Sequence, residues 1–174
     1  MLHKYLPDNR FDKLKIPLTV AATEIRMGKV TYFDSGELIP AVIASSSIPA
    51  LFSPSQFNGN LYVDGGLMDN LPVRPLIGKC DIIIGSQCNP VQQRFDVKSV
   101  KEITERSLLL AISVNSTQSK SHCNVVIEPP ELAKFGTFDL ARGKEIFAIG
   151  YNYTRESFKV EDFQLKKDDS LYED

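Results

Sequence analysis

A carboxylate followed by two glycines is the clearest chemical feature of this sequence. Asp64, Gly65 and Gly66 follow the short apolar run that opens "LYVDGGLMDNLPV", residues 61–73. Glycines let the backbone take positive φ and pass close to another group, so a carboxylate can be presented there at the end of a strand. Such a carboxylate acts as a general base when a nucleophile lies within hydrogen-bond reach. The alternative is that Asp64 only forms a turn, because Asp-Gly is among the commonest turn dipeptides.

A nucleophile to accompany this base is hard to find. No Gly-x-Ser-x-Gly pentapeptide occurs in the 174 residues. Ser86, in "IGSQCN", lacks the spacing, and the serines at 45–47 lack the flanking glycines that allow a sharp strand-to-helix elbow. A conventional Ser-His-Asp triad would have to use His3 or His122, which lie far apart in polar surroundings. We expect His122 to be a solvated residue just before a strand.

Other kinds of site find little support in the sequence. The three cysteines, Cys80, Cys88 and Cys123, fit no zinc pattern, and we expect free thiols packed as small hydrophobic residues in a reducing compartment. The aspartates at 64, 69 and 81 form no recognisable ligand spacing, and no GxxxxGK[ST] phosphate loop is present. We therefore expect neither a metal nor a cofactor.

Composition narrows the class of protein. The chain is 43% hydrophobic and 24% charged, which is ordinary for a globular domain, and its net charge of −2 argues against nucleic acid as a partner. No apolar run approaches the roughly 20 residues that cross a bilayer. The first residues, "MLHKYLPDNRFDKLK", include no apolar stretch of the signal-peptide kind. We expect a cytoplasmic protein and leave peripheral contact with a membrane open.

The elements that would position Asp64 can be predicted from apolar runs and turn residues. Asn58-Gly59 is a strong two-residue hairpin signal, and Gly28 stands at another turn. Asp69 and Asn70 are typical of residues that cap the start of a helix. The expected elements are a buried strand at 15–25, its hairpin partner at 30–33, a short helix from 38 that ends before Pro49, a hairpin over 57–66, and a short helix over 70–80 capped by Asn70.

The second half alternates between strands and helices. Its expected elements are a strand at 81–90, a helix at 97–118, a strand at 124–130 and a helix at 137–158 with Asp139 as N-cap. The continuous apolar run at 81–90 is typical of a strand buried on both faces. Leu140, Ile146, Ile149 and Tyr153 could share the buried face of the last helix. The alternation predicts an α/β fold with a mostly parallel sheet flanked by helices.

Five blocks of the sequence, taken in order, resemble the carboxy-terminal half of a patatin-like phospholipase domain. They are "KYLPDNRFDKLKIPLTVAATEIRMGKVTYFDSG", "ASSSIPALFSP", "LYVDGGLMDNLPV", "CDIIIGSQCNP" and "NVVIEPPELAKFGTFDLARGKEIFAIGY". The tripeptide DGG alone is a weak motif. The ordered set of blocks is far more specific, and it covers nearly the whole chain.

The resemblance implies a catalytic role for Asp64. In this family a Ser-Asp dyad works without histidine, and its aspartate lies in a DG[GA] motif that matches residues 64–66 here. By this resemblance, Asp64 accepts the proton of a serine as the serine attacks an ester carbonyl of a lipid. An acyl-enzyme forms, and water then releases the fatty acid. Gly65 and Gly66 are the supporting residues of the motif.

Two further motifs of the family have no counterpart in this sequence. They are a glycine-rich oxyanion loop and a GxSxG nucleophile elbow, which the family places upstream. We therefore expect a fold incomplete at its amino-terminal side, with residues 1–158 as the carboxy-terminal half of the domain and 159–174 as a charged tail. With no nucleophile in this chain, the chain alone should be inactive. Truncation, proteolysis and a natural standalone remnant are the three explanations.

Two functions stay open from the sequence. The first is the Asp-bearing half of a serine lipid acyl hydrolase, and the second is a non-catalytic remnant that binds protein or lipid. The expected partners are a lipid or ester substrate, the missing amino-terminal half, or a second copy of the chain. An open edge or face of the sheet should make the isolated chain dimerise, exchange strands or dissolve poorly.

Overall fold

The computed structural model describes residues 2–49, 51–91, 99–136 and 139–163. The strands are β1 Val20–Glu24, β2 Lys29–Phe33, β3 Ser55–Phe57, β4 Asn60–Asp64, β5 Ile84–Ser86 and β6 Val125–Ile127. The α-helices are α1 Leu38–Ser45, α2 Val100–Lys120 and α3 Gly143–Ser157. Short 3-10 helices lie between them: η1 Leu2–Lys4, η2 Phe11–Lys13, η3 Gly65–Leu67, η4 Arg74–Leu76, η5 Pro130–Lys134, η6 Leu140–Arg142 and η7 Val160–Phe163.

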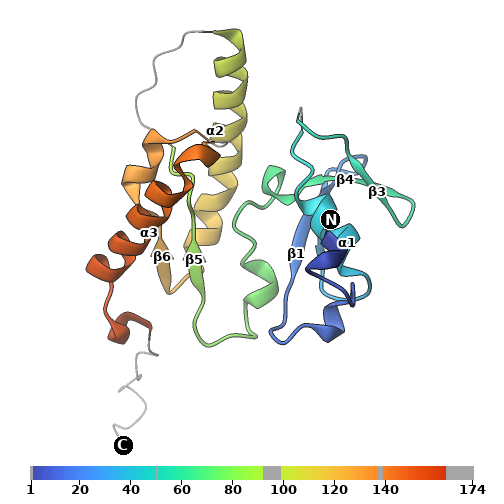
Figure 1. The fold of residues 1–174 in the computed structure, drawn as a ribbon, viewed down its shortest axis with the longest axis horizontal. Helices are drawn as coiled ribbons and strands as arrows, with labels where there is room; N and C mark the ends of the chain where they lie inside the picture. The colour runs from blue at the N-terminus through green and yellow to red at the C-terminus, as the bar shows by residue number, and fades with distance from the viewer. Residues whose placement is uncertain (1, 50, 92–98, 137–138, 164–174) are drawn as a thin grey trace, which may run out of the picture.

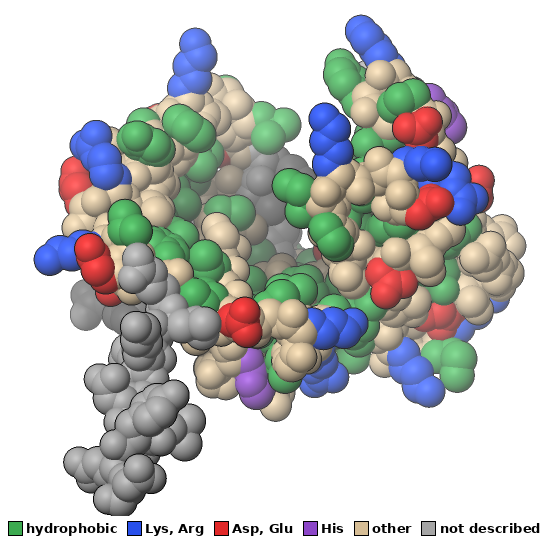
Figure 2. Space-filling model, turned by 90° about the horizontal axis from the view of Figure 1, so that it is seen from below, with side chains coloured by type: hydrophobic (Ala, Val, Ile, Leu, Met, Phe, Trp, Pro, Cys, Tyr) green, Lys and Arg blue, Asp and Glu red, His purple; other side chains and the backbone are tan. Residues whose placement is uncertain are grey.

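The chain forms two parts that lie next to each other (Figure 1). The first part holds a four-stranded sheet and α1, and the second holds β5, β6, α2 and α3. The segment that carries η3 and η4 runs from one part to the other. Figure 2 shows the surface hollowed between the two parts. Asp64 is the last residue of the four-stranded sheet and therefore stands where the chain leaves the first part.

Two tight hairpins build the four-stranded sheet. β1 pairs antiparallel with β2 across the turn at Gly28, whose φ is +61°, and β3 pairs antiparallel with β4. In the second turn Asn58 and Gly59 both have positive φ, +49° and +76°, as a two-residue hairpin of this handedness requires. Both predicted hairpins are thus confirmed. β1 also pairs antiparallel with β4, which gives the order β2-β1-β4-β3.

The prediction of a mostly parallel sheet is wrong. All neighbours in the four-stranded sheet run antiparallel, and β5 with β6 is the parallel pair among the described residues. For the two hairpins and for the parallel pair, the reason is the length of the connections. A short turn can only join antiparallel strands, whereas a parallel pair needs a crossover of a dozen or more residues, which α2 supplies between β5 and β6. The fold is α/β, but alternation of elements was evident in the second half alone.

Helix α1 covers the four-stranded sheet with its apolar side. Leu38 and Ala41 pack with Phe11, and Ala44 packs with Ala22 and Tyr62. The ring of Phe33 contacts those of Phe57 and Tyr62 at centroid distances of 5.6 and 5.3 Å. The helix ends at Ser45, before Pro49 as predicted, so the chain turns back toward the end of β4.

The predicted strand at 15–25 is shorter than expected. β1 begins at Val20, and Ile16 before it is 79% exposed. The four residues after Val20 are all buried, because β1 lies between two other strands and under α1. The apolar run therefore predicted the strand correctly but not its start.

In the second part, most helices and strands are of the predicted type, but several side chains that were expected to be buried are exposed. α2, β6 and α3 lie within or close to their expected ranges, although residues 97–98 and 137–138 fall outside the described residues. The strand expected to be buried on both faces is the short β5, where Ile84 is 49% exposed. Leu140 is 84% exposed and precedes α3, so it shares no buried face with Ile146.

The expectations for the charged tail and for self-association stay predictions. Of the tail at 159–174, the structure describes 159–163, which include η7, and the remainder lies outside the described residues. No described helix combines the length and the apolar character needed to cross a membrane. Dimerisation or strand exchange through open surfaces stays a prediction.

A buried carboxylate ties the two hairpins together. Glu24, at the end of β1, is 6% exposed and accepts hydrogen bonds from the N–H of Met27 (2.7 Å) and of Leu61 (3.3 Å). Burial opposes its charged form, but these backbone donors outweigh burial and hold the pKa of Glu24 below its ordinary value.

Replacing Glu24 by glutamine should therefore destabilise the chain near neutral pH. A lowered folded-state pKa stabilises the fold above the ordinary carboxyl pKa, and this contribution is lost as the pH falls through the folded-state value. Thermal unfolding midpoints of the wild type and of Glu24→Gln should differ near neutral pH and converge in acid. Equal midpoints near neutral pH would contradict this account of Glu24.

Candidate active site

The backbone of Asp64 is held on both sides. In the register of the sheet Asp64 lies opposite Ala22 of β1, and its carbonyl oxygen accepts a hydrogen bond from the Thr23 hydroxyl (3.1 Å). Its N–H donates to the carbonyl oxygen of Ser47, just after α1 (2.9 Å). Strand β4 can therefore end at only one place relative to β1 and α1.

The two glycines give the chain room to turn sharply after Asp64. A Cβ on Gly65 would lie 2.3 Å from the carbonyl oxygen of Ala21, and one on Gly66 would lie 2.8 Å from Oδ1 of Asn70. Neither glycine adopts the positive φ that the sequence allowed. Close approach to the backbone of another strand requires Gly65, whereas the atoms nearest to Gly66 belong to side chains. Gly66 also donates its N–H to Oδ1 of Asp64 (2.8 Å), which folds the carboxylate back over the turn.

Asp64 and both glycines line a cavity of about 270 Å³. Ser45, the last residue of α1, also lines it, but in the described part of the chain no hydrogen bond joins Ser45 to Asp64. The hydroxyls of Ser46 and Ser47 donate to carbonyl oxygens of α1 one turn earlier, each at 2.8 Å. The other lining residues are Thr19, Val20, Ala21, Asp69, Asn70 and Pro72.

The surroundings of Asp64 favour its neutral form. Burial raises the pKa of the carboxyl above its ordinary value, and the single N–H of Gly66 only partly opposes the shift. Oδ1 takes the bond from Gly66, whereas Oδ2 accepts no hydrogen bond from the described residues. A partly buried carboxylate with a raised pKa and one uncommitted oxygen is suited to accept a proton.

Helix α2 reaches the same turn from the second part of the chain. Nδ2 of Asn115 donates to the carbonyl oxygens of Gly66 (3.4 Å) and Leu67 (3.3 Å), and its Oδ1 accepts the N–H of Asn70 (3.2 Å). The side chain of Asn70 in turn donates to the hydroxyl of Ser116 (3.4 Å). The prediction of Asn70 as a helix cap is therefore wrong, since η4 begins only at Arg74.

Sequence reasoning missed these residues of α2. In the last turns of α2 the buried side chains are polar, namely Ser116 and Ser119. These two serines continue the apolar face of the helix at helical spacing, and this was the signal available in the sequence. The pattern would have indicated that α2 makes a buried polar contact, but it would not have identified the residues contacted.

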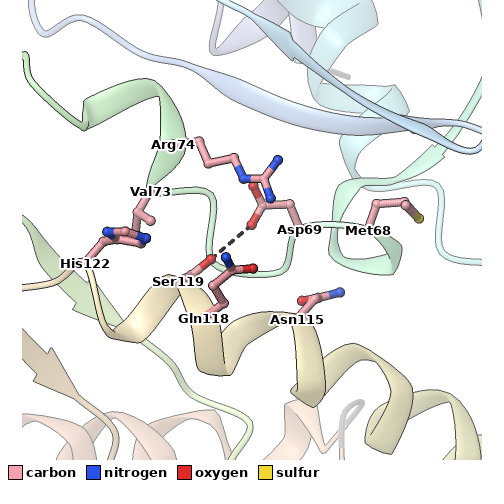
Figure 3. A pocket seen from close by; sticks show the side chains of 8 residues that line it. All are labelled: Met68, Asp69, Val73, Arg74, Asn115, Gln118, Ser119 and His122. Atoms are coloured by element: carbon pink, nitrogen blue, oxygen red, sulfur yellow. Dashed lines mark hydrogen bonds between the residues drawn. The ribbon is translucent and has the colours of Figure 1, made fainter.

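Asp69 is buried as well, and its carboxylate does not cap a helix as predicted. It accepts hydrogen bonds from the hydroxyls of Tyr32 in β2 and of Ser119 in α2. Burial of the Tyr32 hydroxyl, together with its hydrogen bond to Asp69, raises the pKa of Tyr32. Figure 3 shows Arg74 and Ser119 extending toward Asp69 at a small cavity of about 70 Å³, which the exposed His122 also lines.

The cysteines differ from the expectation of packed thiols. All three are free, but Cys80 and Cys88 are exposed, and Cys123 alone is partly buried, which raises the pKa of its thiol. Across the described ranges, no three His, Cys, Asp or Glu side chains gather closely enough to hold a metal ion.

Replacing Gly65 by alanine should strongly destabilise the chain. The added Cβ would meet the backbone carbonyl group of Ala21, which is fixed in strand β1 and cannot move aside as the end of a flexible side chain could, and overpacking of this kind costs about 1–3 kcal/mol or more. We expect urea unfolding to show a loss near the upper end of that range. Gly136→Ala is the matched control, because nothing lies within 4 Å of its added Cβ. Similar losses for both variants would contradict this reading.

Replacing Asp64 by asparagine should stabilise the chain near neutral pH. A carboxyl with a raised folded-state pKa contributes most to stability below its ordinary pKa, and this contribution is lost as the pH rises through the raised value. Asparagine keeps an acceptor for the N–H of Gly66 and removes the charge. The unfolding midpoint of Asp64→Asn should exceed that of the wild type near neutral pH and match it in acid. A lower midpoint near neutral pH would show that the charge is stabilising instead.

Comparison with known proteins supports the resemblance seen in the sequence. Residues 1–77 match the family model of the patatin-like phospholipases. An uncharacterized NTE family protein of Mycobacterium tuberculosis is 37% identical over 87 residues, covering 47% of this chain and 24% of the relative. Lysophospholipase NTE1 of Meyerozyma guilliermondii is 27% identical over 164 residues, covering 79% of this chain and 11% of the relative.

A second lysophospholipase covers a larger share of the chain. Lysophospholipase NTE1 of Kluyveromyces lactis is 28% identical over 177 aligned positions, covering 86% of this chain and 12% of the relative. The chain thus spans a quarter or less of the length of these relatives. The matched residues 1–77 include β4, η3 and the aspartate with its two glycines. Over residues 1–77 the chain is therefore similar to the patatin-like phospholipase family.

Proposed function

We propose that this chain is the Asp-bearing half of a lipid acyl hydrolase that uses a Ser-Asp dyad, with Asp64 as the base. The observation that carries the proposal is the placement of Asp64. Its carboxylate stands at the end of a strand, is partly buried, has a raised pKa and lines a cavity of about 270 Å³. In the relatives whose names state an activity, that activity is lysophospholipase, so an ester of a phospholipid or lysophospholipid is the proposed substrate class.

In the proposed reaction Oδ2 of Asp64 takes the proton of a serine hydroxyl as the serine oxygen attacks the ester carbonyl. The bond of Gly66 to Oδ1 keeps the carboxylate turned in one direction during this step. Asp64 then returns this proton to the alkoxide of the lipid, which leaves as an alcohol when the ester bond breaks, and the acyl group stays on the serine. Water attacks the acyl-enzyme while Asp64 takes a proton from it, and Asp64 passes this proton to the serine oxygen as the bond between serine and acyl group breaks and the fatty acid leaves.

The serine and the oxyanion donors must come from outside residues 1–174. The sequence has no GxSxG and no glycine-rich oxyanion loop, and Ser45 lies in a helix without flanking glycines. Loss of one oxyanion donor alone costs about 2.7–4 kcal/mol of transition-state stabilisation. We therefore propose that the chain alone is inactive, with residues 1–158 as one half of the domain and 159–174 as a charged tail. A cytoplasmic location with peripheral contact to a membrane belongs to the same proposal.

The alternative is a non-catalytic module that binds lipid or protein. The same lack of a nucleophile favours it, because a cavity with a carboxylate can bind without reacting. The two functions can be distinguished by one observation. The hydrolase requires a polypeptide with GxSxG bound or joined to this chain in the source organism, whereas the binding module does not.

The test begins with the intact mass and the N-terminal sequence of the protein as its source produces it. It continues with hydrolysis of a p-nitrophenyl ester and of a lysophospholipid. If a polypeptide with GxSxG is present, Asp64→Asn should lower kcat at least about 100-fold, which is the low end for removal of a general base. Asp34→Asn, at an exposed turn aspartate, is the matched control and should keep full activity.

Two outcomes would overturn the proposal. Hydrolysis that persists in Asp64→Asn at the level of Asp34→Asn would remove Asp64 from the mechanism. A protein that consists of this chain only and hydrolyses neither ester would favour the binding module.

A further inference from the structure

Asn115 makes more hydrogen bonds to the turn after Asp64 than any other side chain of the described residues. Its amide donates to two consecutive carbonyl oxygens, of Gly66 and Leu67, and accepts the N–H of Asn70. These contacts join α2 to a turn 45–49 residues earlier in the chain. One side chain thus contacts the last two residues of η3 and one residue that follows it.

Gly66 links Asn115 to Asp64. Its N–H donates to the carboxylate of Asp64 (2.8 Å), and its carbonyl oxygen accepts from Asn115 (3.4 Å). A glycine has no side chain to restrict its backbone, and it loses more conformational freedom on folding than any other residue. The direction of the Gly66 N–H therefore depends on what holds the peptide groups on either side of it.

We propose that Asn115 is a positioning residue, which holds the N–H of Gly66 against the carboxylate of Asp64 and so fixes the direction in which that carboxylate faces the cavity. Asn115 does not line this cavity and would act only through the turn. The inference rests on the proposed function, because the direction of Asp64 matters for the reaction only if Asp64 is the base. What Asn115 is proposed to change is the direction of the Asp64 carboxylate, which can be measured without any reaction.

The second carboxylate of the cavity makes no hydrogen bond to Asn115 within the described part of the chain. Asp69 is the second carboxylate that lines the cavity of Asp64, and it is held by Tyr32 and Ser119 rather than by Asn115. Ser116 binds the side chain of Asn70 but neither carbonyl oxygen of the turn. Thr117 is exposed, and its hydroxyl donates to the helix carbonyl of Ser113 (3.3 Å). Residues 115, 116 and 117 therefore provide three neighbouring substitutions with different contacts.

The experiment measures the pKa of the Asp64 side chain by carboxyl ¹³C NMR, with the signal assigned from Asp64→Asn. In Asn115→Ala the Gly66 N–H is no longer held, so the pKa of Asp64 should rise further, by about half to one pH unit for one weakened hydrogen bond. Ser116→Ala should lower the unfolding midpoint without moving this pKa, and Thr117→Ala should change neither. An unchanged pKa in Asn115→Ala, or an equal shift in Ser116→Ala, would overturn the proposal.

Amide exchange in the wild-type chain gives a second readout, which is needed if Asn115→Ala does not fold. The N–H of Gly66 should be protected from exchange to the same degree as the amides of α2 around Asn115, because opening of one releases the other. Fast exchange at Gly66 beside a protected α2 would contradict the proposal. Neither measurement uses hydrolysis, so a failed activity test would count against the proposed function and leave this result standing.

Discussion

The close approach of Gly65 to strand β1 is the contact on which the candidate site depends. β4 pairs with β1 up to Asp64, and the next residue must pass directly over the carbonyl oxygen of Ala21, where a Cβ would lie at 2.3 Å. Only a bare backbone fits there. Because the chain turns at this point, the carboxylate of Asp64 faces a cavity, and the peptide groups of η3 come within reach of α2.

The site is completed by a part of the chain that the motif does not include. The match to the family model ends at residue 77, well before α2 begins at Val100. Yet α2 provides Asn115 for the turn, Ser116 for Asn70 and Ser119 for Asp69. The first part presents the carboxylate, and the second part holds the loop that orients it. The two parts are therefore joined at the candidate site by polar contacts, while Leu71 and Val73 of the connecting segment pack with Ile83 of the second part.

Glu24 and Asp64 show how surroundings give two carboxylates different properties. Both lie at the ends of neighbouring strands and both are removed from water, which alone would raise their pKa. Glu24 receives backbone N–H donors from Met27 and Leu61, so its charged form is favoured and it acts as a structural tie. Among the residues that the structure describes, Gly66 is the one donor to Asp64, and burial prevails. A charge that is costly to the fold at this position is typical of a functional site.

The sequence by itself determined the local features of this protein. The turns at Gly28 and at Asn58-Gly59 follow from residues that tolerate positive φ, and the helical spacing of apolar residues predicted α2. The order of the motif blocks also indicated the family whose model matches residues 1–77. Tertiary structure decided the strand directions of the larger sheet and the partners of Asp69 and Asn70, both expected as helix caps. Local preferences act over a few residues, whereas the partners of Asp69 lie 37 and 50 residues away and meet it only once the chain has folded.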